Sequence, residues 1–539
     1  MLKLPIGISN FKEIRNENFY YVDKTGLIED LLNSHCKVTL FTRPRIFGKT
    51  LAMNMLENFF NITKSSKELF DGLKISENKE LCSNHMNQYP TIFITLKEIE
   101  GRDFKEAFNI FKEKIIDLCN SFSFLEYSDK ELFNRFRKGT ATDIEFIRSL
   151  SILTRLLYSH YNKPVILLID EYDIPLAKAT DNGYYNEMLS VMRGFMKVLE
   201  NSNYLKLAVI TGCLCISKKS IFTDSNNFSI SSITSGQYSE YFGFTHNEVQ
   251  QMLEDAGALA QLPEIKEWYG GYNFGGTEIY CPWGVINYLS DYLYGEENLP
   301  KCYWNNSSSN SIIRTFINNY GDRLQKDFTT LLKGKSIQKS IREDLTYDSL
   351  YSSIENFWSI LFLTGYLTSD SKSLDKTDLR IPNKEVQYIY EDTLKEFFND
   401  KVNDSYIELT TALWNGNAEA LSNIISEILL TTISFQEYSE DFCRAFLVGI
   451  FTGLSYKVKS NSENGEGRSD IVVQDYSGLK VAIFEVKHSA KITEMEKDCD
   501  RALAQIRDRQ YTVAYEDEFE EVICYGISFF KKKCLVKTQ

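Results

Sequence analysis

The feature that most constrains this chain is a phosphate-binding pattern placed between an apolar strand and a helix. The apolar run Lys37–Thr42 predicts a strand, Arg43–Thr50 (RPRIFGKT) follows it directly, and Leu51–Phe60 has a helical pattern. A P-loop has the order G-x-x-x-x-G-K-S/T between a strand and a helix, and only its first glycine is missing here, where Arg43 stands. The pattern predicts an α/β domain with a parallel sheet and helices on both faces.

Each position of this loop has a chemical role to fill. Gly48 lets the backbone approach the phosphates, and the amides at the helix start point at the anion. Lys49 would reach the β- and γ-phosphates, and Thr50 would hold a magnesium ion. Arg43 and Arg45 are candidates to add charge near the phosphates. Since G-K-T arises often by chance, an ordinary strand-to-helix turn stays open as the alternative at this point.

Two further runs favour a nucleotide site over that alternative. The apolar run Val165–Asp170 ends in Asp170 and Glu171, which matches a strand that delivers two acids to a nucleotide. Asp170 would organise magnesium and Glu171 would polarise the attacking water. The strand Leu205–Thr211 ends in Thr211, where a residue sensing the γ-phosphate would lie. We therefore expect residues 1–235, with a further strand at Tyr89–Leu96, to bind ATP and Mg²⁺.

The rest of the chain divides into two regions, because 539 residues are too many for one core. Residues 236–435 are mostly helical in pattern and rich in aromatic side chains. Within them, the glycines and proline of Trp268–Tyr288 predict turns between helices. Residues 436–539 return to an alternation of helix and strand, with a helix at Glu440–Leu454 and a strand at Val522–Phe529, which predicts a small α/β domain.

Two acids and a lysine stand out in this last region. Strands are predicted near Asp470–Val473 and at Val481–Lys487, so Glu485 and Lys487 point to one face and Phe484 to the other. If the two strands pair as a hairpin, Asp470 lies beside Glu485. Two carboxylates and a lysine at one sheet edge suit phosphodiester hydrolysis assisted by metal ions. A solvent-facing salt bridge is the alternative reading of the same residues.

Charge and composition limit the classes of function. The net charge is −14. From Tyr456 onward the chain has 14 Lys and Arg and 15 Asp and Glu, so the last region is not broadly basic. The segment 323–342 carries more basic than acidic residues. This excess is interpreted either as a nucleic-acid contact or as a solvated helix face. No run approaches ~18 apolar residues, which predicts no membrane span. The 11 cysteines without a C-x-x-C pair and the five scattered histidines favour a cytoplasmic protein without disulfides or zinc.

Several longer motifs resemble a known family, the predicted AAA-ATPase-like proteins, whose members commonly carry a C-terminal PD-(D/E)XK nuclease-superfamily domain. The resemblance rests on these motifs: LPIG at 4–7, YVDKT at 21–25, RPRxFGKT at 43–50, LLIDEYDxPL at 167–176, TGxxxISKxSIF at 211–222, YFGF at 241–244 and WYGGYNFGG from 268. The tail is similar to the nuclease domain through SNxE at 460–463, GRxD at 467–470, FEVK at 484–487 and ALxQI at 502–506.

The resemblance implies roles that spacing does not show. Arg43 is the family form of the loop rather than a defect. The nuclease core acids and lysine fall on Asp470, Glu485 and Lys487, a further metal-binding acid on Glu440, and a helical glutamine near substrate or metal on Gln505. Asp23 and Lys24 match a motif of unknown role, with the nucleotide base as one candidate partner.

The chain departs from the family pattern at two positions. Cys215 stands where the family usually has an arginine, which puts the rate of hydrolysis in doubt but not binding. Arg444 stands where the family usually has a histidine, which puts nuclease efficiency in mild doubt.

Three functions remain open at this stage. The first is an ATPase coupled to a nuclease that uses Mg²⁺ or Mn²⁺ and acts on nucleic acid, DNA before RNA, in defence against phage or mobile elements. The second is a nucleotide-switched signalling or scaffolding protein whose nuclease fold is a silent binding module. The third is a DNA repair or recombination nuclease. A homo-oligomer is expected, since AAA-type sites are usually completed by an arginine of a neighbouring subunit.

Overall fold

The computed structural model describes most of the chain, with gaps. The described residues are 2–34, 36–122, 130–200, 203–215, 228–295, 299–304, 324, 327–328, 330–345, 353–370, 376–399, 406–432, 439–454, 456–464, 467–475, 479–516 and 518–539. Of the sequence motifs, residues 216–222 and part of the basic segment 323–342 lie outside this set. The chain forms two compact units: Met1–Trp304 with Gln338–Glu385, and Asn305–Ile337 with Val386–Gln539.

The first unit is built on a five-stranded parallel sheet of order β2-β3-β4-β1-β5. Its strands are β1 (Val38–Thr42), β2 (Thr91–Thr95), β3 (Val165–Asp170), β4 (Leu205–Gly212) and β5 (Phe228–Ser231). β3 is buried along its whole length, as expected for a strand covered on both faces. Since all strands run the same way, the ends of β3, β4 and β1 meet at one edge.

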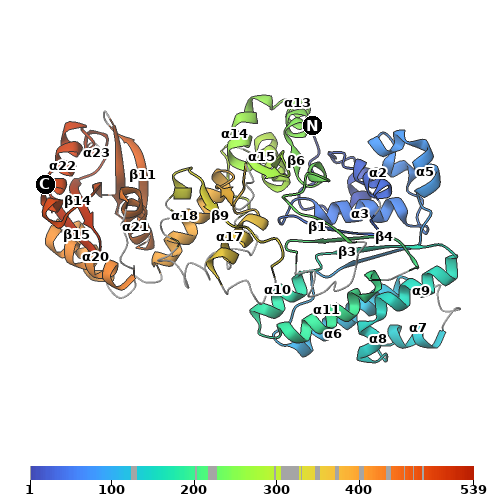
Figure 1. The fold of residues 1–539 in the computed structure, drawn as a ribbon. Coiled ribbons are helices and arrows are strands. Elements are labelled where there is room, and N and C mark those ends of the chain that lie inside the picture. Colours follow the sequence, from blue (N-terminus) through green and yellow to red (C-terminus); the bar gives the residue numbers. More distant parts are fainter. Residues whose placement is uncertain are drawn as a thin grey trace. The chain divides into compact units, whose positions relative to one another are not determined.

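Helices cover both faces of this sheet (Figure 1). On one side lie α2 (Gly26–Asn33), α3 (Lys49–Phe60) and α5 (Lys79–His85); on the other lie α6 (Phe104–Asn120), α9 (Ser149–Tyr161) and α11 (Tyr185–Met196). The shorter α1 (Phe11–Asn16), α4 (Lys67–Phe70), α7 (Lys130–Arg137), α8 (Asp143–Ile147) and α10 (Ile174–Asp181) complete this part. Phe59 of α3 packs with Leu168 and Val209 of the sheet, so apolar burial orients α3 and the loop before it.

A small second sheet in this unit adds to what the sequence predicts. The segment predicted to hold turns between helices contains a β-hairpin, β7 (Tyr272–Phe274) and β8 (Thr277–Tyr280), which β6 (Phe244–Thr245) joins. Gly275 and Gly276 form its turn with φ of 54° and 98°, values that glycine adopts without strain. The sequence does not predict these strands because they are too short for a clear alternation.

Helices surround this hairpin, as the sequence predicts for the middle region. They are α13 (His246–Asp255), α14 (Leu262–Tyr269), α15 (Pro282–Tyr294) and α17 (Ile354–Leu363), with a strand pair of β9 (Ile337–Lys339) and β10 (Thr377–Leu379). Val249, Ile265 and Val285 form the core of the first three helices.

The second unit is built on a mixed sheet of order β11-β12-β13-β14-β15. Its strands are β11 (Lys457–Asn464), β12 (Gly467–Gln474), β13 (Lys480–His488), β14 (Glu521–Phe530) and β15 (Lys533–Thr538). β12 and β13 are antiparallel, as the sequence predicts, and β13 and β14 are parallel because α22 (Met495–Asp508) connects them. The other helices are α18 (Lys384–Asn399), α19 (Tyr406–Trp414), α20 (Ala418–Thr432), α21 (Glu440–Gly453) and α23 (Val513–Glu516).

Both faces of β13 pack in a hydrophobic core, and one of them also carries the candidate nuclease residues. Phe484 and Val486 pack with Phe446 of α21 in one core, while Val481 and Ile483 pack with Ile506 of α22 in the other. Glu485 and Lys487 follow Ile483 at two-residue spacing and therefore lie on the α22 face. The division of the chain at 235 and 435 stays a prediction. No helix of the described residues has the length and apolar character needed to cross a bilayer.

Candidate nucleotide and nuclease sites

The loop between β1 and α3 has the backbone of an anion-binding turn. Ile46 and Gly48 have positive φ, 62° and 86°, and Gly48 is the N-cap residue that precedes α3. A positive φ at a β-branched residue is strained, and such strain is characteristic of functional loops. The turn presents backbone amides at a helix N-terminus, which is the arrangement that binds phosphate.

The side chains predicted to bind nucleotide and magnesium converge beside this loop. The Thr50 hydroxyl donates to Asp170 Oδ2 at 2.8 Å, and the Thr211 hydroxyl donates to the other oxygen of Asp170. Lys49 Nζ lies 3.5 Å from Glu171 Oε1 and donates to Pro44 O at 3.0 Å. The first turn of α3 and the ends of β3 and β4 therefore bring their polar groups to one point of the sheet edge.

The electrostatics of this cluster suit a cation. Burial raises the pKa of Asp170, although the hydroxyls of Thr211 and Thr50 counteract it. Burial alone would lower the pKa of Lys49, but the nearby groups Cys213, Glu171 and Asp173 outweigh it and raise the pKa. Among the described atoms, Glu171 Oε2 is buried without a hydrogen-bond partner. A hydroxyl beside a buried carboxylate, with a second acid adjacent, is a donor set that fits Mg²⁺.

Arg43 does not lie where the sequence suggested. Its side chain is fully buried, and its guanidinium donates to Ser231 O at 2.6 Å and Thr42 O at 3.0 Å. The guanidinium also lies over the rings of Phe242 and Phe274, at 5.2 and 5.6 Å from their centroids. Burial lowers its pKa to about 9. Arg43 therefore anchors the loop to β5.

Arg45, like Lys49, is near enough to Cys213 to affect the pKa of its thiol. Burial raises the pKa of Cys213 to about 12, and Lys49 and Arg45 both act against that rise through their charge. The two cations thus share a neighbour at the end of β4. Binding of phosphate by Arg45 stays a prediction.

Asp173 belongs to this site and was missed by the sequence reasoning. It is buried, and its Oδ2 accepts the backbone amides of Cys213 and Leu214, both at 3.0 Å. It thereby fixes the end of β4 next to Lys49. Its spacing of three residues after Asp170, in IDEYD, was the signal that could have indicated it.

The YVDKT motif makes contacts within the first unit. Lys24 Nζ pairs with Glu248 Oε2 at 2.6 Å and donates to Glu240 O at 2.6 Å. Asp23 Oδ2 accepts the amide of Lys74 at 2.6 Å. These contacts tie the N-terminal segment to α13, and a place near the nucleotide base stays a prediction.

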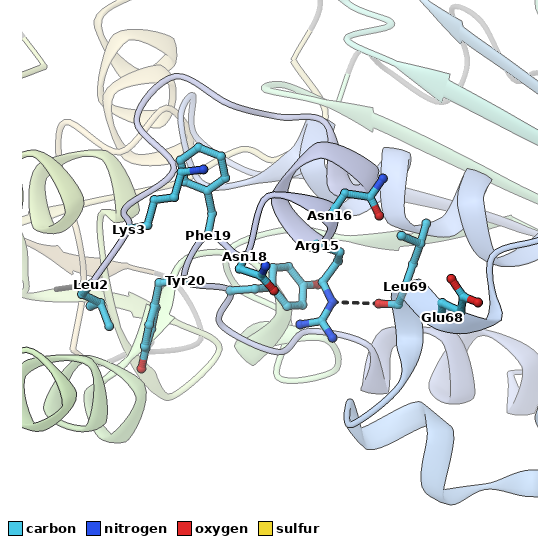
Figure 2. Close-up of a pocket in the computed structure, with 10 residues that line it drawn as sticks. Leu2, Lys3, Arg15, Asn16, Asn18, Phe19, Tyr20, Glu68 and Leu69 are labelled. Carbon is cyan, nitrogen blue, oxygen red and sulfur yellow. Dashed lines mark hydrogen bonds between the residues drawn. The ribbon is translucent and has the colours of Figure 1, made fainter.

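A separate hollow of about 520 Å³ lies at the N-terminal segment and α4. Figure 2 shows its lining, including Lys3, Tyr20 and Glu68, and the bond from Arg15 Nε to Leu69 O, 2.8 Å. None of the residues predicted to bind nucleotide lines it. We therefore place the candidate nucleotide site at the β1–α3 loop and not at this hollow.

In the second unit, the two acids and the lysine predicted for nuclease chemistry lie together. Asp470 Oδ2 accepts the amide of Val486 at 2.9 Å, which fixes its carboxylate beside Glu485. Lys487 Nζ lies 2.7 Å from Glu485 Oε1, on the same face of β13. The hairpin geometry thus joins residues from β12 and β13 at one edge.

Glu485 is the most constrained of these groups. It is 2% exposed, and its Oε2 has no hydrogen-bond partner among the described residues. Burial first, and then the charges of Asp470 and Glu440, raise its pKa to about 7 despite Lys487. A buried carboxylate oxygen that lacks a partner among the described residues, beside the carboxylate of Asp470, fits a divalent cation.

The nuclease roles predicted for Glu440 and Gln505 stay predictions. No group of three or more His, Cys, Asp or Glu in the described part of the chain is spaced to hold a metal ion, so Glu440 is not shown to complete the set. Gln505 lies on α22, the helix over this face, and its amide donates to the Tyr511 hydroxyl at 3.4 Å. Its approach to substrate or metal is not shown.

Arg444 makes a contact that spacing could not reveal. Its Nε lies 3.1 Å from Asp470 Oδ1, and another of its nitrogens lies 3.2 Å from Asp441 Oδ1. The residue that departs from the family pattern therefore pairs directly with a predicted metal ligand.

Comparisons with known proteins match two parts of the chain. Residues 5–222 match the family described as predicted AAA-ATPase, and residues 438–539 match the PD-(D/E)XK nuclease superfamily. The chain thus carries an AAA-ATPase-like domain and a nuclease-superfamily domain, which confirms the resemblance and the predicted fold class.

Two individual proteins are similar over much of the chain. An uncharacterized protein in the vnfD 5′ region of Azotobacter chroococcum mcd 1 is 24% identical over 556 aligned residues, covering 98% of this chain and 96% of that protein. The ORC2 protein of Aeropyrum pernix, solved as ADPNP–ADP complexes, is 13% identical with a TM-score of 0.26, covering 71% of this chain and 98% of its own. A TM-score this low supports no inference about this chain.

Proposed function

We propose that this protein hydrolyses ATP and uses that cycle to control a metal-dependent nuclease. The observation that carries the nuclease part is the buried Oε2 of Glu485, which has no hydrogen-bond partner among the described residues and lies beside Asp470 and Lys487. The ATPase part is supported by the cluster of Lys49, Thr50, Asp170, Glu171 and Thr211 at one sheet edge.

The proposed roles follow from the chemistry of each group. Lys49, with the loop amides and Arg45, binds the phosphates, and Glu171 orients the attacking water. Thr50 and Asp170 would hold Mg²⁺, which neutralises phosphate charge. In the second unit, Glu440, Asp470 and Glu485 would hold Mg²⁺ or Mn²⁺, which supplies charge stabilisation and an activated water.

The remaining nuclease roles are those of positioning. Lys487 lies within reach of Glu485 and would orient or deprotonate the water. Gln505 is proposed to approach substrate from α22. The proposed substrate is nucleic acid, and we favour DNA over RNA.

Contacts of the phosphate loop suggest how ATP binding reaches the middle region. The Phe47 ring lies 5.0 Å from Tyr272 and 5.3 Å from Phe274 of the β7–β8 hairpin. A Cβ at Gly365 would lie 3.0 Å from Pro44, so the segment after α17 also packs against the loop. A shift of the loop on ATP binding would therefore move these elements, since packed side chains transmit displacement.

The test uses purified full-length protein with plasmid DNA, linear DNA and RNA, with Mg²⁺ or Mn²⁺, and with and without ATP. Asp470→Ala should abolish cleavage, and Lys49→Ala should abolish ATP binding and change the ATP dependence of cleavage. Asp508→Ala and Lys105→Ala, at exposed positions of α22 and α6, are the matched controls. Cleavage that persists in Asp470→Ala would contradict the assignment.

A nucleotide-switched signalling or scaffolding protein is the second candidate. The Arg444–Asp470 ion pair favours it, because this pair occupies a predicted metal ligand. ATP binding by the wild type without cleavage of any substrate would select this candidate. Defence against phage or mobile elements and DNA repair or recombination share the same chemistry, so the choice between them needs genetic assays.

Assembly and location are tested separately. We propose a cytoplasmic location. We also propose a homo-oligomer, by analogy with AAA-type sites that a neighbouring subunit completes. Sedimentation with and without ATP measures this directly, and a monomer under both conditions would contradict it.

A further inference from the structure

The guanidinium of Arg444 lies against Asp470, one of the acids proposed to hold a divalent cation. Arg444 lies on α21, and its side chain is 18% exposed, as compared with 12% for that of Asp470. Its Nε is 3.1 Å from Asp470 Oδ1, while Asp470 Oδ2 already accepts the amide of Val486. Both oxygens of this carboxylate are therefore engaged by groups of the protein.

Asp470 and Glu485 each have a cationic partner without any metal. Glu485 has Lys487 at 2.7 Å, and Asp470 has Arg444 at 3.1 Å. A divalent ion held by the two acids would lie within a few ångströms of a guanidinium. Like charges at such distances repel strongly in a largely buried site. Metal binding is therefore in competition with Arg444.

Arg444 has an alternative carboxylate nearby. Asp441, one turn earlier on α21, lies 3.2 Å from a guanidinium nitrogen of Arg444 and 2.9 Å from Lys333 Nζ. Asp441 is 45% exposed, so rearranging its ion pairs costs little. The guanidinium can thus leave Asp470 and keep a charged partner.

We propose that Arg444 is a resident counter-cation which lowers the affinity of the nuclease site for divalent metal, so that the site loads only when the metal displaces it from Asp470. The inference rests on the proposed function, because it assumes that Asp470 and Glu485 hold the metal. It concerns the regulation of that site.

The experiment measures Mn²⁺ binding directly, by calorimetry and by the electron paramagnetic resonance of free Mn²⁺, on the full-length protein stripped of metal and without ATP. Arg444→Gln removes the charge and should tighten Mn²⁺ binding about tenfold. Arg444→Met is a second neutral variant with the same expected direction. Arg444→Lys keeps a cation and should stay close to the wild type.

Arg501→Gln is the matched control, since Arg501 forms an Arg–Asp pair with Asp498 on α22 in the same unit. It should leave Mn²⁺ affinity unchanged, and thermal unfolding checks that every variant is folded. Affinity in Arg444→Gln and Arg444→Met equal to or weaker than that of the wild type would overturn the inference. If Mn²⁺ binding is lost in Asp470→Asn at the same time, the proposed metal site stands and only the role of Arg444 fails.

Binding that persists unchanged in Asp470→Asn would instead locate the ion elsewhere. That outcome would overturn the proposed metal site and this inference with it. The two failures are therefore distinguished by one variant.

Discussion

At the scale of single residues, Arg43 occupies the first position of the P-loop motif but makes contacts that the motif does not predict. A P-loop usually opens on glycine, and here the position holds a fully buried arginine. Its hydrogen bonds go to carbonyl and hydroxyl oxygens of β5 and its neighbours, and no carboxylate is among its described partners. Arg43 therefore holds the loop against the edge strand.

We expect Arg43→Lys to destabilise the first unit. Lysine cannot reproduce the planar guanidinium, so buried acceptors such as Ser231 O would lose their donor, at a cost of ~2–4 kcal/mol. Urea unfolding measures the change. Arg155→Lys, on the exposed side of α9, serves as the control. A loss below about 0.5 kcal/mol would contradict the anchoring role.

Glu171 gives the second prediction at this scale. It has φ of 55° and lies 3.5 Å from Lys49, which suits a group that positions water rather than one that binds phosphate. Glu171→Gln should keep ATP binding and slow hydrolysis by about 10²–10⁴-fold. Phosphate release and binding of a fluorescent ATP analogue measure the two effects. Glu113→Gln on α6 should change neither, and hydrolysis at the wild-type rate in Glu171→Gln would exclude the role.

At the scale of elements, the start of α18 contains a buried acid that the proposed chemistry does not use. Glu385 is fully buried, and its Oε1 accepts the amide of Trp304 at 2.8 Å. Its Oε2 has no hydrogen-bond partner among the described atoms. Burial raises its pKa from 4.5 to about 7. The contact lies within the first unit and joins Glu385 to the segment that follows α15.

This raised pKa predicts a pH dependence of stability. The folded state binds the proton of Glu385 more tightly than the unfolded state, so its contribution is full below pH 4.5 and is lost as pH rises to about 7. Glu385→Gln should flatten this fall and stabilise the protein at pH 8 by roughly 2 kcal/mol. Thermal unfolding between pH 4.5 and 8.5 measures it, with the exposed Glu355→Gln as control. A parallel pH profile in Glu385→Gln would refute the assignment.

At the scale of the whole molecule, the chain has two compact units with separate cores. The nucleotide cluster belongs to the first unit and the acids of β12 and β13 belong to the second. Each ligand should therefore stabilise its own unit, by about 2.7 kcal/mol at a concentration of 100 times its dissociation constant.

We expect two calorimetric unfolding transitions. ATP with Mg²⁺ should raise the midpoint of one, and Mn²⁺ without ATP should raise the midpoint of the other. Lys49→Ala should remove the first shift and Asp470→Asn the second. A single transition that both ligands raise together would show that the units unfold as one.

The sequence by itself determined the features that depend on local pattern. The apolar runs of β1, β3 and β4, the loop with Gly48 and Lys49, and the alternation that places Glu485 and Lys487 on one face of β13 all follow from short-range periodicity. The resemblance extended these to the family and to the fold class, which the comparisons confirm.

Only the tertiary structure decided where several polar side chains point. The turn of Arg43 toward β5, the bonds of Asp173 to the end of β4 and the pairing of Arg444 with Asp470 each join residues far apart in the chain. Short strands such as β7 and β8 likewise lack a local signal. Such contacts are set by packing and by the need to satisfy buried polar groups, and these requirements arise only once the elements have assembled.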